Sequence, residues 1–357
     1  RIDSKRVLKI ALPMMLSNIT VPLLGFVDTA VIGHLGNAKL IAALGLGSIL
    51  ISTLYWLCGF LRMGTTGLVA QAKGSHQEDE VFYALIRGLL IGVILGFLIL
   101  LSSYPIFSIF FKLSPAELAV ETLAVEYANI RVLSAPFAIA TIPIIGWLIA
   151  LEKTFSILII QILINLLNLF LNLYLVYQLN YGIQGVAYAS LFSEIFGFIL
   201  VLYISFKSLK FIPRFLVKEI FKKEKWKKLL NINFNIFIRS VLLELVFLSF
   251  FFWASSFGTL ILAVNQILIQ FLHIFAYALD GFAFAGEVLV GISYGKKNIA
   301  QLRKAVFLCF NWAAFTALIL SGMFFIFGNS FTQLMTNAEE VLEIAKKFKF
   351  WIILVPL

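Results

Sequence analysis

The chain has 357 residues, of which 61% are hydrophobic and only 13% are charged, and its mean hydropathy is +1.00. Because a soluble domain has about 25% charged residues, the composition excludes a soluble globular protein. It predicts an all-α protein that crosses a membrane several times. The sequence lacks the alternation of apolar and polar residues that the strands of a membrane barrel show.

The net charge of +10 does not indicate nucleic-acid binding, because the basic residues follow a membrane topology. Twenty of the 28 Lys and Arg residues lie in or beside alternate loops, and nine of those lie between residues 207 and 228. The intervening loops contain only Lys39 and Lys112. This bias predicts a plasma (inner) membrane protein with a cytoplasmic N-terminus. We expect no cleavable signal peptide, since the first apolar run has no small-residue cleavage site.

Hydropathy, with turns and charges as breaks, predicts ten spans. In chain order they cover residues 7–33, 40–72, 81–104, 121–151, 154–179, 183–206, 229–255, 259–294, 299–327 and 341–357. The first span contains Pro13, Pro22 and Asp28. Proline inside a helix removes a backbone hydrogen bond, so the helix is expected to bend at these positions. An acid at membrane depth usually marks a substrate or ion pathway; the alternative is a static helix whose Asp28 is satisfied by neighbouring hydroxyls or amides.

The fifth span carries a polar stripe made of Gln161, Asn165, Asn168 and Asn172. Their spacings of four, three and four residues place them on one helical face. Amide side chains are not left facing lipid, so this face meets protein or a water-filled cavity. We expect the stripe to line a cavity together with Asp28; the alternative is that the amides only join helices.

The basic segment 207–228 divides the chain into residues 1–206, with six spans, and residues 229–357, with four. Residues 41–74 align without a gap on residues 262–295, at an offset of 221 residues. Such a repeat of six-helix units is typical of transporters and predicts two six-helix bundles joined by a cytoplasmic linker. About ten of twelve helices would then be present, with about 70 further residues expected from the repeat.

Several stretches resemble one known family. They read LPMMLSNITVPLLGFVDTAVIGHLG in the first span, NLFLN followed by GIQGVAYAS, NFNIFIRS, and AVNQILIQ with DGFAFAGEVLVG. Together they are similar to the DinF-like branch of the MATE multidrug and toxin exporters. The resemblance implies a twelve-helix, two-lobed fold that exports organic cations and other amphiphiles in exchange for H⁺ or Na⁺.

The resemblance also assigns roles to individual residues. It places the substrate and coupling carboxylate on Asp28, the bending proline on Pro13, and the fifth-helix amides on Asn168 and Asn172. Several relatives have an aspartate where this chain has Asn172, which leaves Asp28 as the one acid expected in the first cavity.

In the eighth span, Asp280 and Glu287 lie seven residues apart on one face. An ion-binding role and a structural role remain open for them.

We therefore expect a secondary active exporter whose partners are small-molecule drugs, organic cations and the lipid bilayer. Binding of a proton and of a cationic substrate at Asp28 would exclude each other, and Na⁺ is the rival coupling ion. Apart from that ion no cofactor is expected, nor an obligate protein partner. The alternative is a lipid-linked oligosaccharide flippase, which tends to have several basic residues in its cavity. The chain contains no HExxH or comparable catalytic motif, so an enzyme is not expected.

Overall fold

A computed structural model describes residues 2–113, 116–209, 216–335 and 339–356, and the described residues form helices and no strand. In chain order the elements are α1 (Ser4–Gly33), α2 (Ala38–Leu57), α3 (Phe60–Gly74), α4 (Glu78–Leu101), α5 (Ser103–Leu113), α6 (Leu118–Arg131), η1 (Val132–Ser134), α7 (Ala135–Ala150), α8 (Thr154–Asn172), η2 (Leu173–Gln178), α9 (Gly182–Ser208), α10 (Val217–Ile220), α11 (Lys223–Ser256), α12 (Thr259–Gly295), α13 (Ile299–Met335) and α14 (Glu339–Leu354). Within the described ranges, nine helical stretches are long and apolar enough to cross a membrane. The protein is therefore a polytopic all-α membrane protein, as the composition predicted.

Several predicted spans differ from the helices observed, and the fourth divides into α6 and α7 around η1. The second divides into α2 and α3 at Cys58 and Gly59. The third ends at Leu101, and a separate helix, α5, follows; Pro105 lies in its first turn, where its missing N–H costs no hydrogen bond. The tenth corresponds to α14, whose 16 residues are too few for one of the nine candidate stretches.

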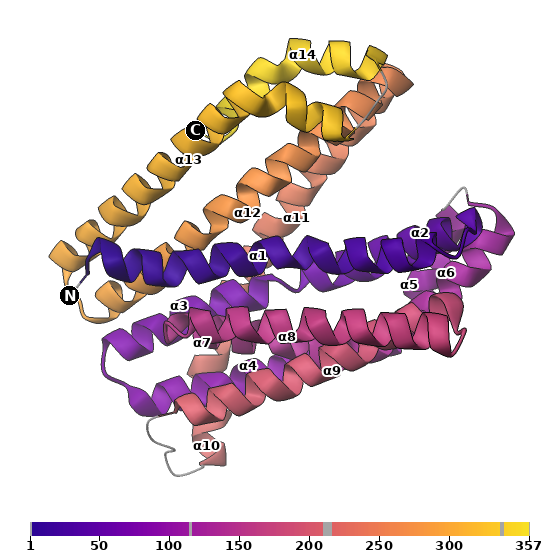
Figure 1. Ribbon diagram of the computed structural model, residues 1–357. Coiled ribbons are helices and arrows are strands. Elements are labelled where there is room, and N and C mark those ends of the chain that lie inside the picture. Colours follow the sequence, from indigo (N-terminus) through magenta and orange to yellow (C-terminus); the bar gives the residue numbers. More distant parts are fainter. Residues whose placement is uncertain (1, 114–115, 210–215, 336–338, 357) are drawn as a thin grey trace.

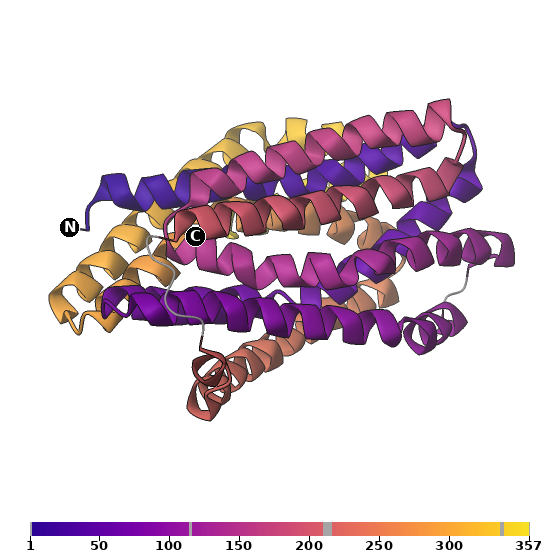
Figure 2. The same cartoon turned by 90° about the horizontal axis from the view of Figure 1, so that it is seen from below.

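The helices form two groups that diverge like the arms of a V (Figure 1). The first bundle comprises α1–α9 and the second comprises α11–α14. The end where the bundles meet also carries the N-terminus, α10 and the turn between α12 and α13, and we call it the linker end. At the opposite, open end the two arms separate. Figure 2 shows the first bundle from below, with its long helices running side by side between the two ends.

The bundles touch closely where α3 crosses α12. A methyl group on Gly74 would collide with the carbonyl oxygen of Ile292, and one on Gly295 would collide with that of Gln71. The two glycines differ by 221 residues in the sequence, and so do Gln71 and Ile292. Equivalent residues of the predicted repeat thus meet across a local two-fold axis, which supports the repeat.

The segment after α9 is attached to the first bundle. Arg87 of α4 is 3% exposed and donates hydrogen bonds to the carbonyl oxygens of Ile220 at 3.0 Å and Glu219 at 3.0 Å. Ile220 packs against Phe82 and Tyr83. Helix α11 then begins at Lys223, earlier than the predicted residue 229, because lysine and glutamate are good helix formers even where the sequence is not apolar.

Candidate functional site

The site starts from α1, which remains one continuous helix although it contains Pro13 and Pro22. Pro13 has no N–H for the carbonyl oxygen of Lys9, four residues earlier. The Thr154 hydroxyl at the start of α8 donates to that oxygen at 3.1 Å. The missing backbone bond is thereby replaced by a contact between α1 and α8, which fixes the two helices side by side. Bending at Pro13 and Pro22 remains a prediction.

Asp28 lies near the open end of α1 and meets the amide stripe of α8. The Asn172 side-chain amide donates to Asp28 Oδ1 at 2.7 Å and to Asn168 Oδ1 at 2.9 Å. Asn168 in turn donates to the Ser190 hydroxyl of α9 at 3.2 Å. One hydrogen-bonded chain therefore joins α1, α8 and α9, and it brings together three of the predicted site residues.

This chain is closed to solvent in the conformation described. The exposed fractions are 7% for Asp28, 1% for Asn168 and 0% for Asn172. Among the described residues, no Lys, Arg or His forms an ion pair with Asp28, and Asn172 Oδ1 has no hydrogen-bond partner. A buried carboxylate without an ion pair and a buried amide oxygen without a donor therefore lie together in the described part of the chain.

The other half of the stripe makes a different contact. Gln161 donates to Asn165 Oδ1 at 3.1 Å, and Asn165 donates to the backbone carbonyl of Thr20 in α1 at 3.3 Å. Both side chains are half-buried. The structure therefore places Gln161 and Asn165 at the α1–α8 interface, nearer the linker end, rather than on Asp28.

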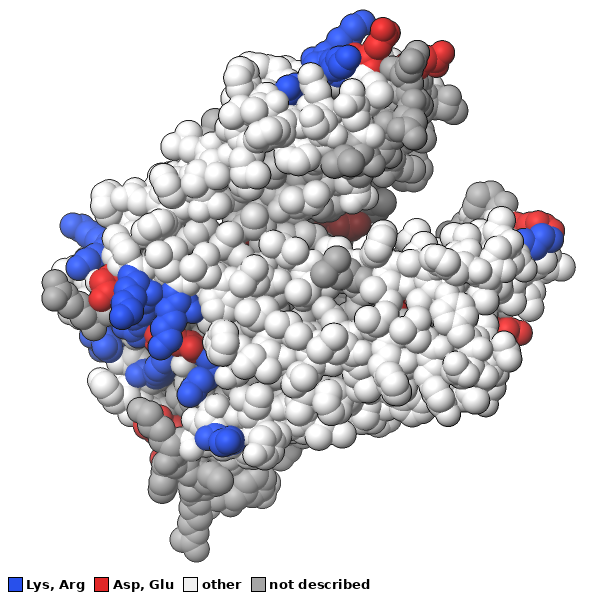
Figure 3. Space-filling model, viewed as in Figure 1, with Lys and Arg blue, Asp and Glu red and all other residues white. Residues whose placement is uncertain are grey.

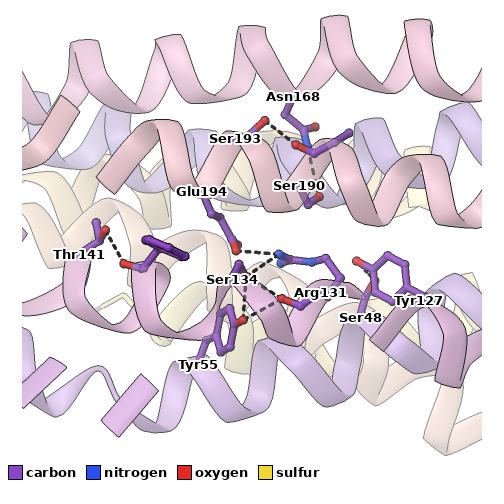
Figure 4. Close-up of polar contacts among 12 residues, drawn as sticks. Ser48, Tyr55, Tyr127, Arg131, Ser134, Thr141, Asn168, Ser190, Ser193 and Glu194 are labelled. Atoms are coloured by element: carbon purple, nitrogen blue, oxygen red, sulfur yellow. Dashed lines mark hydrogen bonds and ion pairs between the residues drawn. The ribbon is translucent and has the colours of Figure 1, made fainter. Parts of the chain in front are cut away.

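Beside the Asp28 chain lies a polar network that sequence reasoning did not identify (Figure 4). Arg131 of α6 pairs with Glu194 of α9 at 2.7 Å. The Tyr55 hydroxyl bonds to the Ser134 hydroxyl at 2.8 Å and to the Arg131 carbonyl oxygen at 3.1 Å. Because the two charges are 63 residues apart, the sequence carries no periodic signal of the pair. The ion pair with Glu194 neutralises the Arg131 guanidinium, which would otherwise face Asp28 without a partner.

A π-helical segment, η2, follows Asn172 directly. Single π turns occur frequently at functional sites because they shift the side chains that follow. The Tyr177 hydroxyl within η2 donates to the Val31 carbonyl oxygen at 2.9 Å. The last turn of α1, which begins just beyond Asp28, is thus attached to the irregular end of α8.

In the second bundle, Asp280 and Glu287 form no hydrogen bond with each other within the described residues. Glu287 pairs with Arg62 of α3 at 3.0 Å, and the Arg62 guanidinium lies 4.2 Å from the centre of the Phe284 ring. Asp280 is exposed. The contact with Arg62 gives Glu287 a partner in the other bundle, which sequence reasoning did not foresee.

The fold and the buried polar group define a two-bundle, polytopic helical membrane protein with an acid inside its first bundle. The sequence model of the MatE family matches residues 13–175 and 236–356. The chain therefore belongs to the MatE family.

Two curated relatives illustrate this membership. The chain is 34% identical to DNA damage-inducible protein F of Escherichia coli (strain K12), over 99% of this chain and 77% of that protein. It is 26% identical to a probable multidrug resistance protein NorM of Bacillus anthracis, over 96% of this chain and 77% of that protein.

Solved structures agree on the fold. An outward-facing multidrug resistance MATE family transporter matches with a TM-score of 0.87 at 20% identity, over 99% of this chain and 80% of that one. A MOP superfamily transporter from Pyrococcus furiosus matches with a TM-score of 0.86 at 20% identity, over the same shares. The resemblance stated from the sequence motifs is thus confirmed at the level of family and fold.

Proposed function

We propose that the protein is a secondary active multidrug exporter that moves organic cations and other amphiphilic drugs out of the cell in exchange for a cation. Family membership and the names of the relatives support export. The observation that supports a coupling site is the buried Asp28 carboxylate beside Asn172 Oδ1, which has no hydrogen-bond partner in the described ranges.

The chemistry of this pair favours uptake of a small cation. A buried carboxylate is unfavourable unless a positive charge or a proton compensates it. A protonated Asp28 gains an O–H donor, and Asn172 offers an acceptor for it. We propose H⁺ as the coupling ion, with Na⁺ as the rival, because carboxylate and amide oxygens also ligate hard cations.

Exchange of a drug for a proton would follow if both bind at Asp28 and only one can bind at a time. Protonation removes the negative charge that attracts a cationic drug, so the drug and the proton compete for Asp28. Because the group is closed in this conformation, drug access requires α1 or α8 to move. Pro13 and Pro22 are the positions where α1 is expected to bend.

The flippase alternative has less support. It would favour unpaired basic residues around the cavity, whereas Arg131 and Arg62 are each paired with a glutamate. Catalysis is not proposed, nor is a cofactor other than the coupling ion. We place the protein in the plasma membrane, with the linker end in the cytoplasm.

The test is transport by purified protein in proteoliposomes. Uptake of a fluorescent organic cation is measured under an imposed H⁺ gradient and, separately, a Na⁺ gradient. Asp28→Asn should abolish gradient-driven uptake, while Glu126→Gln, which changes an exposed acid of α6, should transport normally. Wild-type activity of Asp28→Asn on the H⁺ gradient would contradict the coupling role. Failure of the wild type on both gradients would contradict export itself.

A further inference from the structure

A seam between the bundles runs along α3 and α4 on one side and α11 on the other, and it contains two cavities. The cavity at the linker end has a volume of about 330 Å³, and its polar lining includes Gln71, Glu80, Arg87, Lys225, Lys228 and Lys297. The other has a volume of about 500 Å³ and is almost wholly apolar, with a lining that includes Phe60, Leu95, Leu98, Leu230, Asn233 and Phe234.

The two cavities follow one another along the same helices. On α4, the polar cavity is lined between Glu80 and Arg87, and the apolar one begins at Ile91. On α11, the polar lining ends at Leu229 and the apolar lining begins at Leu230. The seam therefore changes from charged to apolar in the direction that leads from the linker end into the membrane.

The charged part of the seam has an excess of positive charge. Glu80 accepts from Arg87 at 2.8 Å and pairs with Lys225 at 3.3 Å. Lys228 contacts only the neutral Gln71 side chain, at 3.4 Å, and Lys297 forms no ion pair within the described part of the chain. One carboxylate is thus shared by two cations while two further lysines remain unneutralised, which favours an anionic ligand.

Asn233 lies where the charged part gives way to the apolar part. It is 2% exposed, and neither its amide nitrogen nor its amide oxygen has a hydrogen-bond partner among the described residues. Leaving a buried amide unpaired is costly. This residue lies one helical turn beyond Leu229 and lines the apolar cavity.

We propose that the seam binds one anionic phospholipid, with its phosphate among Lys225, Lys228 and Lys297 and an acyl chain in the apolar cavity. The apolar cavity opens toward the bilayer, since Leu98 and Phe234 on its lining are 52% and 62% exposed. A free phosphate would use only the basic cavity and leave the apolar cavity and Asn233 unexplained.

Because both bundles form the seam, the bound lipid stabilises the conformation in which the linker end is closed. This site is separate from Asp28, and its test does not depend on drug transport.

The experiment is native mass spectrometry of the purified protein after incubation with phosphatidylglycerol or phosphatidylcholine. The wild type should retain one phosphatidylglycerol and no phosphatidylcholine. The Lys225→Gln, Lys228→Gln double variant should lower the affinity by roughly fivefold for each lysine removed. The matched control is Lys223→Gln with Lys227→Gln, which makes the same charge change in the same turns of α11 but outside the cavity; it should retain the lipid as the wild type does.

A second arm tests the acyl chain. Leu95→Trp fills the apolar cavity and should lower lipid retention at least fivefold, and Leu98→Trp, at the exposed rim, serves if Leu95→Trp does not fold. Excess inorganic phosphate should not displace the lipid.

Three results would overturn the proposal. One is equal loss of lipid in the control pair, which would indicate only general attraction to the basic end. Another is equal retention of phosphatidylcholine. The third is that the folded tryptophan variant retains phosphatidylglycerol as the wild type does and that inorganic phosphate displaces the lipid. This pair of results would indicate a site for the phosphate group alone.

Discussion

The hydrogen bond between Asn172 and Asp28 limits which cations the buried Asp28 carboxylate can bind. The amide uses its N–H to donate to the carboxylate, and its oxygen has no hydrogen-bond partner among the residues described. One carboxylate with one free neutral acceptor can accommodate a single proton or a single small cation. An aspartate at the position of Asn172 would instead place two carboxylates in contact.

Replacing Asn172 with aspartate tests this limit. Two carboxylates in hydrogen-bonding distance do not both ionise readily, so the pair should retain a proton to higher pH than Asp28 alone. We expect the external pH at which drug transport is half-maximal to rise by at least about one unit. Transport is measured in proteoliposomes across a series of external pH values.

Asn165→Asp is the control, since Asn165 lies on the same face of α8 but bonds to Thr20 rather than to Asp28. Its pH profile should match that of the wild type. An unchanged profile for Asn172→Asp would show that Asp28 does not hold the coupling proton.

Helix spacing made part of this site predictable. The intervals of four, three and four residues place the amides of α8 on one face whatever that helix packs against. The partners of the amides depend on how α8 is rotated against α1 and α9, and spacing within one helix contains no information about that rotation. Spacing therefore indicates that Asn168 and Asn172 share the face that bonds to Asp28, but it gives no sign of the contact between Asn165 and the Thr20 carbonyl.

The same reasoning applies to charged pairs and irregular segments. Arg131 with Glu194, and Arg62 with Glu287, join residues that are far apart in the sequence. A hydropathy profile identifies the separate apolar runs, but it does not indicate which of the resulting helices pack against one another. It also does not distinguish the π-helical η2 from an ordinary last turn of α8, because both are equally apolar.

At the linker end, Glu152 holds three elements of the first bundle together. It occupies the turn between α7 and α8 with a φ of 64°, and it accepts from Arg6 of α1 at 2.7 Å and Lys73 of α3 at 2.9 Å. Burial alone would raise the pKa of Glu152, but the hydrogen bond from Arg6 and the charge of Lys73 lower it to about 2. The two ion pairs therefore remain formed at any physiological pH.

Glu152→Gln should destabilise the protein by about 2 kcal/mol at pH 7, because it leaves two partly buried cations without their partner. The folded-state pKa lies below the ordinary value of 4.5, so the stabilisation is complete above pH 4.5 and is lost as the pH falls toward 2. The difference between wild type and variant should thus shrink as the pH falls from 4.5 toward about 2. This difference in stability is measured by thermal unfolding in detergent, monitored by circular dichroism.

Glu117→Gln provides the comparison, because its ion pair with Lys39 is exposed, with side-chain exposures of 63% and 52%. That change should cost less than about 1 kcal/mol. A Glu152→Gln variant as stable as Glu117→Gln would show that the contacts of Glu152 do not hold α1 and α3.

Over the whole molecule, charge is distributed unevenly along the direction of the helices. Figure 3 shows the lysine and arginine side chains gathered mainly at the linker end, with a smaller group at the tip of the second bundle and a hollow between the two arms. The flanks between the ends are white, as expected for surfaces that face lipid. Such an asymmetry orients a protein in the membrane through the positive charges of its loops.

We expect the linker end to face the cytoplasm, and single cysteines test this. Lys218→Cys, on α10, should react with a membrane-impermeant maleimide only in inverted vesicles. Lys112→Cys, on the exposed side of α5 at the open end, should react in intact cells. Both native cysteines are buried and should contribute little background. Labelling of Lys218→Cys in intact cells would reverse the proposed orientation.

We expect the crossing of α3 and α12 at Gly74 and Gly295 to act as a pivot for α12. No side chain separates the two backbones there, because Gly74 lies against the carbonyl oxygen of Ile292 and Gly295 against that of Gln71. Helix α12 has 37 residues and is roughly 55 Å long at 1.5 Å per residue. Turning it by about 10° at the pivot moves its other end by roughly 10 Å. We therefore expect the close backbone crossing at Gly74 and Gly295 to be the place where a small turn of α12 widens the open end by the size of a drug molecule while the linker end hardly moves.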